Sequence, residues 1–474
     1  MLAALAVPGV AWAEPPAHPP GPGELVGPDY VDHHQRPPEY DDPNLVVPPS
    51  SGADPDYPLA VGFTPADPSN YTNGGIVSYD YVVVHTMQGY YAGSISWFQN
   101  PAANVSAHYV MRSADGEVTQ MVRDDDRAWH VGNSNSYALG IEHEGFVAET
   151  GWYTWETYLS SARLTRWLCE QHGIPVSRDH IVGHVELPNQ THTDPGPLWD
   201  WELYMALVRD VVPQGEIHGV VVDRSRACEL TTTASTWIKA TLEDAAELAD
   251  DQRCQVPAGT TLRVLHQSPD MAGHARLSFD TGGSPCAGAL AQEGYAWLGD
   301  LETSCDPAAV AAEGASVTLD GTTTLDVDGE GRFVLGGVAQ GQHGLEVSAD
   351  GFLDGGAMVD VAVYPGARLV IALDPVGSGD ETGGSEDTGG DEGPIDGTGD
   401  PPGGTGMTSG DDLPADDDPS AGSEDEGGRA LPPGFGEGED AGCGCAQRGR
   451  PPGLAWGFPL LVLGLRRRSR RGRN

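Results

Sequence analysis

An apolar run that ends in a histidine sets the first constraint on how this chain can fold. Residues 81–85 read YVVVH, and an unbroken run of β-branched residues is typical of a strand that is buried on both faces. Two other short segments also carry chemically reactive residues: LGIE at residues 139–142, and GH at 183–184 with TDPGP at 193–197. The sequence thus predicts that distant segments of the chain contribute to one site.

The reactive residues in these segments form a ligand set for a catalytic metal ion. A catalytic zinc site has three protein ligands and leaves a fourth position for water, whereas a structural zinc site is closed. His85, His184 and Asp194 supply two imidazoles and one carboxylate. A glutamate nearby, Glu142, could move protons for the water that attacks the substrate. This pattern predicts a zinc hydrolase.

Further motifs surround these segments in a fixed order. They are VSAHY at 105–109, DG at 115–116, RAWHVG at 127–132 and GIP at 173–175. Together with the first three segments, they resemble the zinc-dependent N-acetylmuramoyl-L-alanine amidases, a family that also contains phage-type amidases and the peptidoglycan recognition proteins. The resemblance covers about a third of the chain, which we assign as an amidase domain at residues 58–213.

The resemblance implies a set of roles for individual residues. It makes His85, His184 and Asp194 the ligands of Zn²⁺ and places Glu142 where the family has its catalytic acid/base. It also implies that the substrate is peptidoglycan, cleaved at the amide between N-acetylmuramic acid and L-alanine. Glu144 lies on the same face of the expected strand as Glu142 and is the alternative acid/base.

One position departs from the family pattern. Many amidases of this type have a lysine two residues before the ligand carboxylate, where it stabilises charge on the scissile carbonyl; this chain has His192 there. The one lysine of the chain, Lys239, lies outside the matched segment. A histidine can also donate a hydrogen bond to an oxyanion, so we expect His192 to be catalytic. The alternatives are a non-catalytic peptidoglycan-binding protein and hydrolysis of another amide.

Three residues of the matched motifs are candidates for substrate binding: His108, Trp129 and His130. The face of Trp129 can stack on a sugar or a peptide. Packing in the core is an equal alternative for Trp129 and His130. A histidine on a strand, as expected for His108, is more often structural than a metal ligand.

Periodicity and stop signals predict an α/β architecture for the amidase domain. Strand patterns at 109–111 and 118–122 flank an Asp-Gly turn, and a helical pattern at 154–172 ends at Gly173. A last helix is expected at 198–212. We expect a mixed sheet with helices packed on it and the zinc ion in a surface groove.

Two small β-rich modules are expected to follow. The first, residues 215–307, contains Cys228, Cys254, Cys286 and Cys305, and four cysteines in an exported protein predict two disulfides with three possible pairings. Cys169 stands alone and is expected to be a small buried residue. The second module, residues 308–375, resembles the carboxypeptidase regulatory-like β-sandwich, which is usually a spacer or an adhesive module.

Charge and low complexity characterise the rest of the chain. The formal net charge of −45 argues against nucleic acid as a partner. Much of it lies in residues 376–440, a run of Gly, Asp, Glu, Pro, Ser and Thr. Such a segment cannot bury enough apolar surface to offset its chain entropy, so we expect a disordered acidic linker.

Both ends of the chain have features of export. Residues 1–13 are small and apolar and end in AWA, the pattern of a signal-peptide cleavage site, and a Pro-rich linker is expected at 14–57. Residues 441–474 combine two cysteines, a short apolar stretch and an arginine cluster. This tail resembles the C-terminal sorting signal of myxobacterial surface proteins. We therefore expect an exported protein, at the cell surface, in the periplasm or secreted, with a sorting protease and a membrane anchor acting through the tail.

Overall fold

The computed structural model describes residues 36–377, except for residues 189, 191 and 303. The expected signal peptide (1–13), sorting tail (441–474) and nearly all of the acidic linker (376–440) lie outside the described residues. Within the described part of the chain, no helix combines the length and apolar character that crossing a membrane requires.

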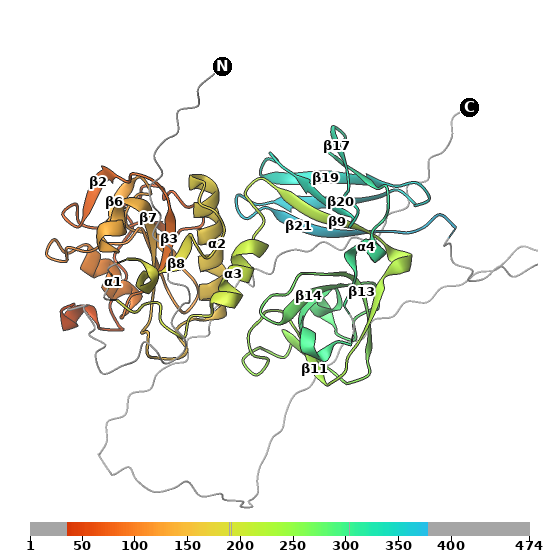
Figure 1. Ribbon diagram of the computed structural model, residues 1–474, viewed down its shortest axis with the longest axis horizontal. Helices are drawn as coiled ribbons and strands as arrows, with labels where there is room; N and C mark the ends of the chain where they lie inside the picture. Colours follow the sequence, from red (N-terminus) through yellow and green to blue (C-terminus); the bar gives the residue numbers. More distant parts are fainter. Residues whose placement is uncertain (1–35, 189, 191, 303, 378–474) are drawn as a thin grey trace, which may run out of the picture. The chain divides into compact units, whose positions relative to one another are not determined.

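The N-terminal domain is a mixed six-stranded sheet with helices on both faces (Figure 1). The strand order is β1-β5-β4-β7-β3-β8; β4 and β5 are antiparallel, and the other neighbours are parallel. The strands are β1 (Gly62–Phe63), β3 (Tyr81–Thr86), β4 (Tyr109–Met111), β5 (Val118–Gln120), β7 (Ala138–His143) and β8 (Ile181–Gly183). The expected α/β class is confirmed.

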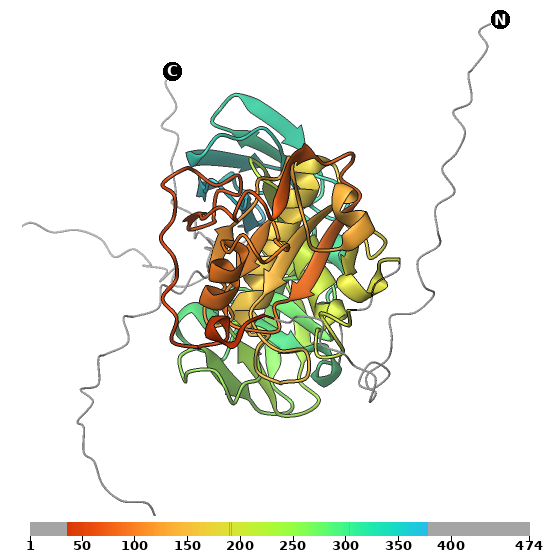
Figure 2. The ribbon, with the colours of Figure 1, turned by 90° about the vertical axis from the view of Figure 1, so that its left-hand side faces the viewer.

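Three helices and a small second sheet complete this domain, which faces the viewer in Figure 2. The helices are α1 (Tyr91–Phe98), α2 (Trp155–His172) and α3 (Trp201–Asp210), and the second sheet pairs β2 (Tyr71–Gly75) with β6 (Asp126–Ala128). Helix α2 begins where Thr154 accepts a hydrogen bond from the backbone of Thr157, and it ends at Gly173, whose φ is 70°. The helix expected at 154–172 is therefore confirmed, with both of its ends set by capping residues.

Side-chain alternation along β3 separates the core from the functional face. Val82 and Val84 pack with Leu164 of α2 in one buried cluster, whereas Val83 belongs to a cluster on the opposite face. Because successive side chains of a strand point to opposite faces, His85 lies on the same face as Val83, away from α2. The same alternation in β7 buries Leu139 and Ile141 beside α2 and turns Glu142 toward His85.

The disulfide-bearing module is an antiparallel sheet in the order β10-β13-β14-β15-β11-β12. Its strands are β10 (Cys228–Thr231), β11 (Thr236–Lys239), β12 (Arg253–Val256), β13 (Thr261–Gln267), β14 (His274–Phe279) and β15 (Glu293–Trp297). Of the three pairings that the sequence left open, the structure has Cys228–Cys305 and Cys254–Cys286. Cys169 of the N-terminal domain is buried, as expected.

The last module is a sandwich of a four-stranded and a three-stranded sheet around one apolar core. The orders are β17-β16-β19-β20 and β18-β9-β21. The elements are β9 (Ile217–Asp223), α4 (Pro307–Val310), β16 (Ser316–Leu319), β17 (Thr323–Asp326), β18 (Arg332–Leu335), β19 (Gly341–Ser348), β20 (Gly355–Val361) and β21 (Ala367–Leu373). Strand β9 lies in the sequence of the expected 215–307 module but pairs in parallel with β21. The division of the chain at residue 308 therefore does not follow the sheets.

Candidate metal centre

The sheet brings the three predicted ligands together at the end of β3. In the parallel register His85 is paired with Glu142 of β7, and Val84 is paired with Gly183 of β8. His184 follows β8 directly, as the first residue of a 3-10 turn. Asp194 comes from the next loop, where its backbone carbonyl accepts a hydrogen bond from the N–H of Val185. The carboxyl ends of parallel strands thus place distant residues side by side, as the sequence predicted.

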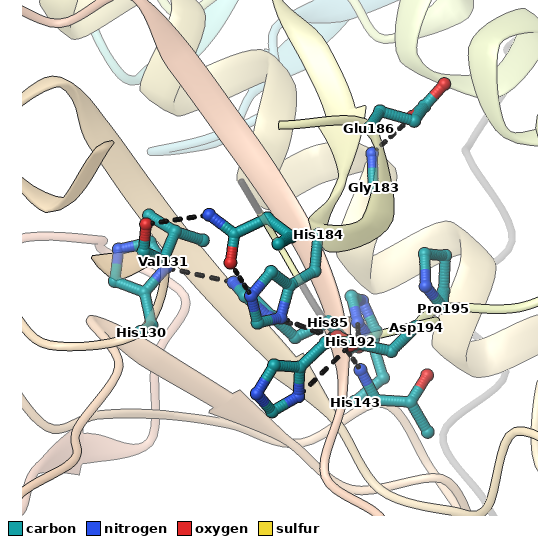
Figure 3. A network of polar contacts seen from close by, with 12 residues as sticks. His85, His130, Val131, His143, Gly183, His184, Glu186, His192, Asp194 and Pro195 are labelled. Atoms are coloured by element: carbon teal, nitrogen blue, oxygen red, sulfur yellow. Dashed lines mark hydrogen bonds and ion pairs between the residues drawn. The ribbon is translucent and has the colours of Figure 1, made fainter. Parts of the chain in front are cut away.

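The three ligand groups are buried and converge on one point (Figure 3). The Nδ1 atoms of His85 and His184 lie 3.1 Å apart, and each is 3.1 Å from a carboxylate oxygen of Asp194. Zinc with bonds of about 2.0–2.2 Å in a tetrahedron holds its ligands about 3.3 Å apart. The triangle therefore has the size and the chemistry that Zn²⁺ requires. No other group of this kind occurs within the residues that the structure describes.

The outer nitrogen of each histidine ligand has a hydrogen-bond partner. His85 Nε2 lies 2.9 Å from His130 Nδ1, and His184 Nε2 lies 2.9 Å from the side-chain oxygen of Gln190. Because a metal binds the lone pair of Nδ1, the Nε2 atoms must carry hydrogen and donate. His130 then accepts through Nδ1 and directs its own Nε2–H toward the carbonyl of Ala138, 3.4 Å away. Burial, with neighbouring histidines, holds the pKa of His130 well below its usual value, so it remains a neutral acceptor.

The two candidate acid/base residues have different surroundings. Glu142 lines the pocket next to the ligands, and its Oε2 has no hydrogen-bond partner within the described structure. Burial raises the pKa of Glu142 to about 8; nearby Asp194 also raises it, while His184 and Arg36 oppose the shift. Glu144 instead uses both carboxylate oxygens, which accept hydrogen bonds from the backbone N–H groups of Tyr91 and Ser113. Geometry favours Glu142 over its alternative.

His192 lies beside the ligand triangle. Its ring stacks on that of His184 with centroids 4.4 Å apart and planes inclined by 14°, and its Nδ1 is 4.0 Å from a carboxylate oxygen of Asp194. The side chain is 26% exposed and lines the pocket. This position allows it to reach a group bound next to the metal.

The predicted substrate-binding residues divide into two groups. Trp129 and His130 line the pocket, and the indole N–H of Trp129 donates to Thr72 Oγ1 at 3.0 Å, which fixes the ring. His108 does not line it. This residue is fully buried, accepts the backbone N–H of Gly140 and contacts the carbonyl of Asp126 through Nε2. His108 therefore joins β7 to β6, because a histidine inside the sheet must satisfy both ring nitrogens with backbone groups.

The pocket itself has a volume of about 510 Å³ and several walls that sequence reasoning missed. The lining residues are Arg36, Trp97, Ala103, Asn104, Val105, Trp129, His130, Gly132, Asn135, Glu142, His184 and His192. Arg36 lies in the segment expected to be a linker, where no pattern distinguished it. Trp97 is on α1, where a tryptophan is as readily explained by core packing.

Comparisons with known proteins agree with this site. Residues 76–197 match the family model Amidase_2, described as N-acetylmuramoyl-L-alanine amidase. N-acetylmuramoyl-L-alanine amidase A of Achromobacter lyticus is 41% identical in an alignment 163 residues long that covers 31% of this chain and 92% of that protein. The 1,6-anhydro-N-acetylmuramyl-L-alanine amidase AmpD of Escherichia coli K12 is 38% identical in an alignment 112 residues long that covers 22% of this chain and 58% of that protein.

A solved structure is also similar. The crystal structure of a selenomethionine AmpD derivative aligns with 28% identity and a TM-score of 0.28, covering 32% of this chain and 96% of that one. From its own geometry, the site is that of a metal-dependent hydrolase on a mixed α/β sheet. The identity of 41% to the Achromobacter enzyme, over 92% of its length, shows the family as well: the chain belongs to the N-acetylmuramoyl-L-alanine amidase family. His85, His184 and Asp194 form the metal site typical of its zinc-dependent members.

Proposed function

We propose that this chain hydrolyses the amide bond between the lactyl group of N-acetylmuramic acid and L-alanine in peptidoglycan. The observation that carries the proposal is the buried triangle of His85, His184 and Asp194. Glu142 lines the pocket together with His184, and its Oε2 has no hydrogen-bond partner among the described residues. When bound there, zinc would polarise the scissile carbonyl and lower the pKa of water.

In the proposed mechanism Glu142 moves the protons. Its carboxylate takes a proton from the attacking water and returns it to the nitrogen of L-alanine as the amide bond breaks. In the metal-free chain, burial raises the pKa of Glu142 to about 8. The positive charge of a bound zinc ion would lower that pKa, toward the range in which the carboxylate accepts a proton from water and returns it. A purely recognition-type protein has no use for such a group beside a metal, which favours the enzyme over the non-catalytic alternative.

The other polar groups position the substrate. His192, stacked on His184 at the edge of the pocket, would donate a hydrogen bond to the oxyanion that develops on the scissile carbonyl. The face of Trp129, fixed by its bond to Thr72, would support a sugar or the peptide. His130 would act through His85 by holding the tautomer that binds the metal.

The proposal is tested by mass spectrometry of peptidoglycan digested with the full chain, with and without a metal chelator. We expect peptides with new L-alanine amino termini and intact glycan strands, and loss of this release in the chelator, restored by Zn²⁺. Binding to peptidoglycan without any such release would establish the non-catalytic alternative. Cleavage at a different amide would leave the metal hydrolase and refute the bond assignment.

The two disulfides and the cell-wall substrate suggest a location outside the cytoplasm. On the sequence alone we also propose export through residues 1–13 and surface anchoring through the sorting tail at 441–474. Cell fractionation of the full chain and of a chain lacking 441–474 tests the anchor, since only the full chain should remain with the envelope. Equal release of both chains would refute it.

A further inference from the structure

The first described residue of the chain, Arg36, lines the pocket. Residues 36–47, which we call the N-terminal strap, precede the family match at 76–197 and run beside helix α1 (Figures 1 and 2). The ring of Tyr40 packs on Trp97 with centroids 5.1 Å apart, and its hydroxyl accepts a hydrogen bond from the side chain of Asn100 at 2.8 Å. The strap is therefore a packed part of the domain, although the sequence suggested a linker here.

Two glycines of the amidase domain leave room for the strap. A Cβ atom at Gly89 would lie 1.4 Å from Nη2 of Arg36, and one at Gly93 would lie 1.8 Å from the carbonyl oxygen of Tyr40. A larger residue at Gly93 would require the backbone of the strap to move, whereas one at Gly89 would displace the guanidinium of Arg36 from its present place. Both the strap and the start of α1 thus have sequences that suit this contact.

Arg36 is the point at which the strap reaches the pocket. Its side chain is 4% exposed and donates hydrogen bonds to Asp41 Oδ1, Ser94 Oγ and the carbonyl of Gln88, at 2.8–2.9 Å. A guanidinium has five N–H groups, so two remain without a partner among the described residues. Among the described pocket-lining residues, Arg36 is the one arginine or lysine.

The charge of Arg36 is unusual in its surroundings. The chain has a formal net charge of −45, and the pocket also contains the carboxyl group of Glu142 next to Asp194. A planar guanidinium carries a positive charge and matches the two oxygens of a carboxylate, so it can hold such a group through two parallel hydrogen bonds. Arg36 forms an ion pair with Asp41 of the strap at 2.9 Å, and its two N–H groups without a partner among the described residues leave it able to bind a second anionic group.

We propose that Arg36 is a specificity-determining residue that binds a carboxylate of the peptide attached to N-acetylmuramic acid, beyond the L-alanine. This inference rests on the proposed function. The group recognised is the acidic peptide attached to N-acetylmuramic acid. The residue that recognises it lies in a segment outside the family match. The two N–H groups of Arg36 that have no partner among the described residues bind the carboxylate, while the other three contact Asp41, Ser94 and Gln88.

The test compares two substrates that differ only in charge: N-acetylmuramoyl-L-alanyl-D-glutamate and its diamide. Wild type should cleave the acid with a kcat/KM about 10- to 100-fold higher, mostly through KM, the scale of one hydrogen bond to a charged group. Arg36→Gln should bring the ratio close to one by losing activity on the acid alone. Arg36→Lys should retain part of the preference, because a lysine keeps the positive charge but cannot donate two parallel hydrogen bonds to a carboxylate.

Tyr40→Phe is the matched control, because it removes the hydrogen bond with Asn100 without changing the charge of the pocket. It should keep the wild-type preference, and all variants should retain stoichiometric zinc. Equal loss of preference in Tyr40→Phe and Arg36→Gln, or no preference in wild type, overturns the proposal, as does failure of wild type to cleave either compound. Release of L-alanine amino termini from whole peptidoglycan is scored separately, and its absence would refute the proposed function instead.

Discussion

Substitution of Gly140 by alanine should weaken zinc binding although Gly140 does not touch the metal site. A Cβ atom at this position would lie 2.5 Å from Nδ1 of His130, 2.7 Å from Cε1 and 2.9 Å from Cγ. Ordinary contacts of a Cβ atom begin near 3.4 Å, so the imidazole ring must retreat by about 0.9 Å. The overlap is with a packed ring rather than with the end of a flexible chain, so it cannot be relieved by a simple rotation.

This displacement acts on the atom that receives the hydrogen bond from His85. The bond between His85 Nε2 and His130 Nδ1 is 2.9 Å long and fixes the ring orientation that directs Nδ1 of His85 toward the metal. Loss of such a support for a metal-binding histidine typically costs about 10- to 100-fold in metal affinity. We therefore expect Gly140→Ala to raise the Kd for Zn²⁺ by that factor, measured by competition with a chromophoric chelator.

Two further variants make this reasoning refutable. Gly336→Ala is the matched control, because a Cβ atom there has no neighbour within 4 Å, and it should bind zinc as wild type does. In a double-mutant cycle, Gly140→Ala should cost nothing more once His130→Ala has removed the clashing ring. An equal additional loss in that background, or wild-type affinity in Gly140→Ala itself, would show that His130 does not transmit the effect.

Three other outcomes follow from the site. Glu142→Gln should lower kcat by roughly 10²-fold or more with zinc retained, whereas Glu144→Gln should reduce stability and keep the chemistry; the reverse pattern would reassign the base. His192→Ala should lower kcat by about 10- to 10³-fold and His192→Lys should remain active; an unchanged alanine variant would leave His192 without a role in the reaction. Burial lowers the pKa of His143 to about 4, so the folded state resists its protonation. The unfolded chain therefore binds a proton at His143 at a higher pH than the folded chain does. In zinc-free protein this difference lowers the free energy of unfolding by about 3 kcal/mol as the pH falls from 6.5 toward 4. His143→Gln should make the free energy of unfolding, measured by denaturant titration, less dependent on pH between 6.5 and 4. The same pH dependence in wild type and variant would show that His143 is not its source.

The residues that the sequence located best are those fixed by strand alternation and by motif. His85, His184 and Asp194 follow short segments whose apolar patterns dictate their place in a parallel sheet, so their convergence could be anticipated. The preference for Glu142 over Glu144 could not be derived from alternation, because both residues point to the same side of the strand. The Gly-Ile-Glu motif favoured Glu142, and the structure adds a physical reason, the two backbone N–H groups that occupy Glu144.

Features that depend on long-range pairing were beyond the sequence. Any of the three pairings of the four cysteines satisfies the same composition, and the choice is made by the sheet that brings Cys228 to Cys305. The contact of Arg36 with the pocket depends on the space left by Gly89 and Gly93. Nothing in the sequence distinguishes these two glycines from the others. His108 was misplaced as a substrate contact because its partners, Gly140 and Asp126, are on other strands.

The pairing of β9 with β21 has a mechanical consequence. Strand β9 follows the amidase domain directly, and β21 is the last strand of the described chain, yet the two are parallel neighbours over residues 217–223 and 367–373. Tension applied between the amidase domain and the chain after Leu373 pulls the start of β9 against the end of β21. Such a pull loads all of the hydrogen bonds of the ladder together, in shear, rather than opening them one after another. The disulfide-bearing module, inserted between the two strands in the sequence, lies outside this load path and stays folded while the ladder holds.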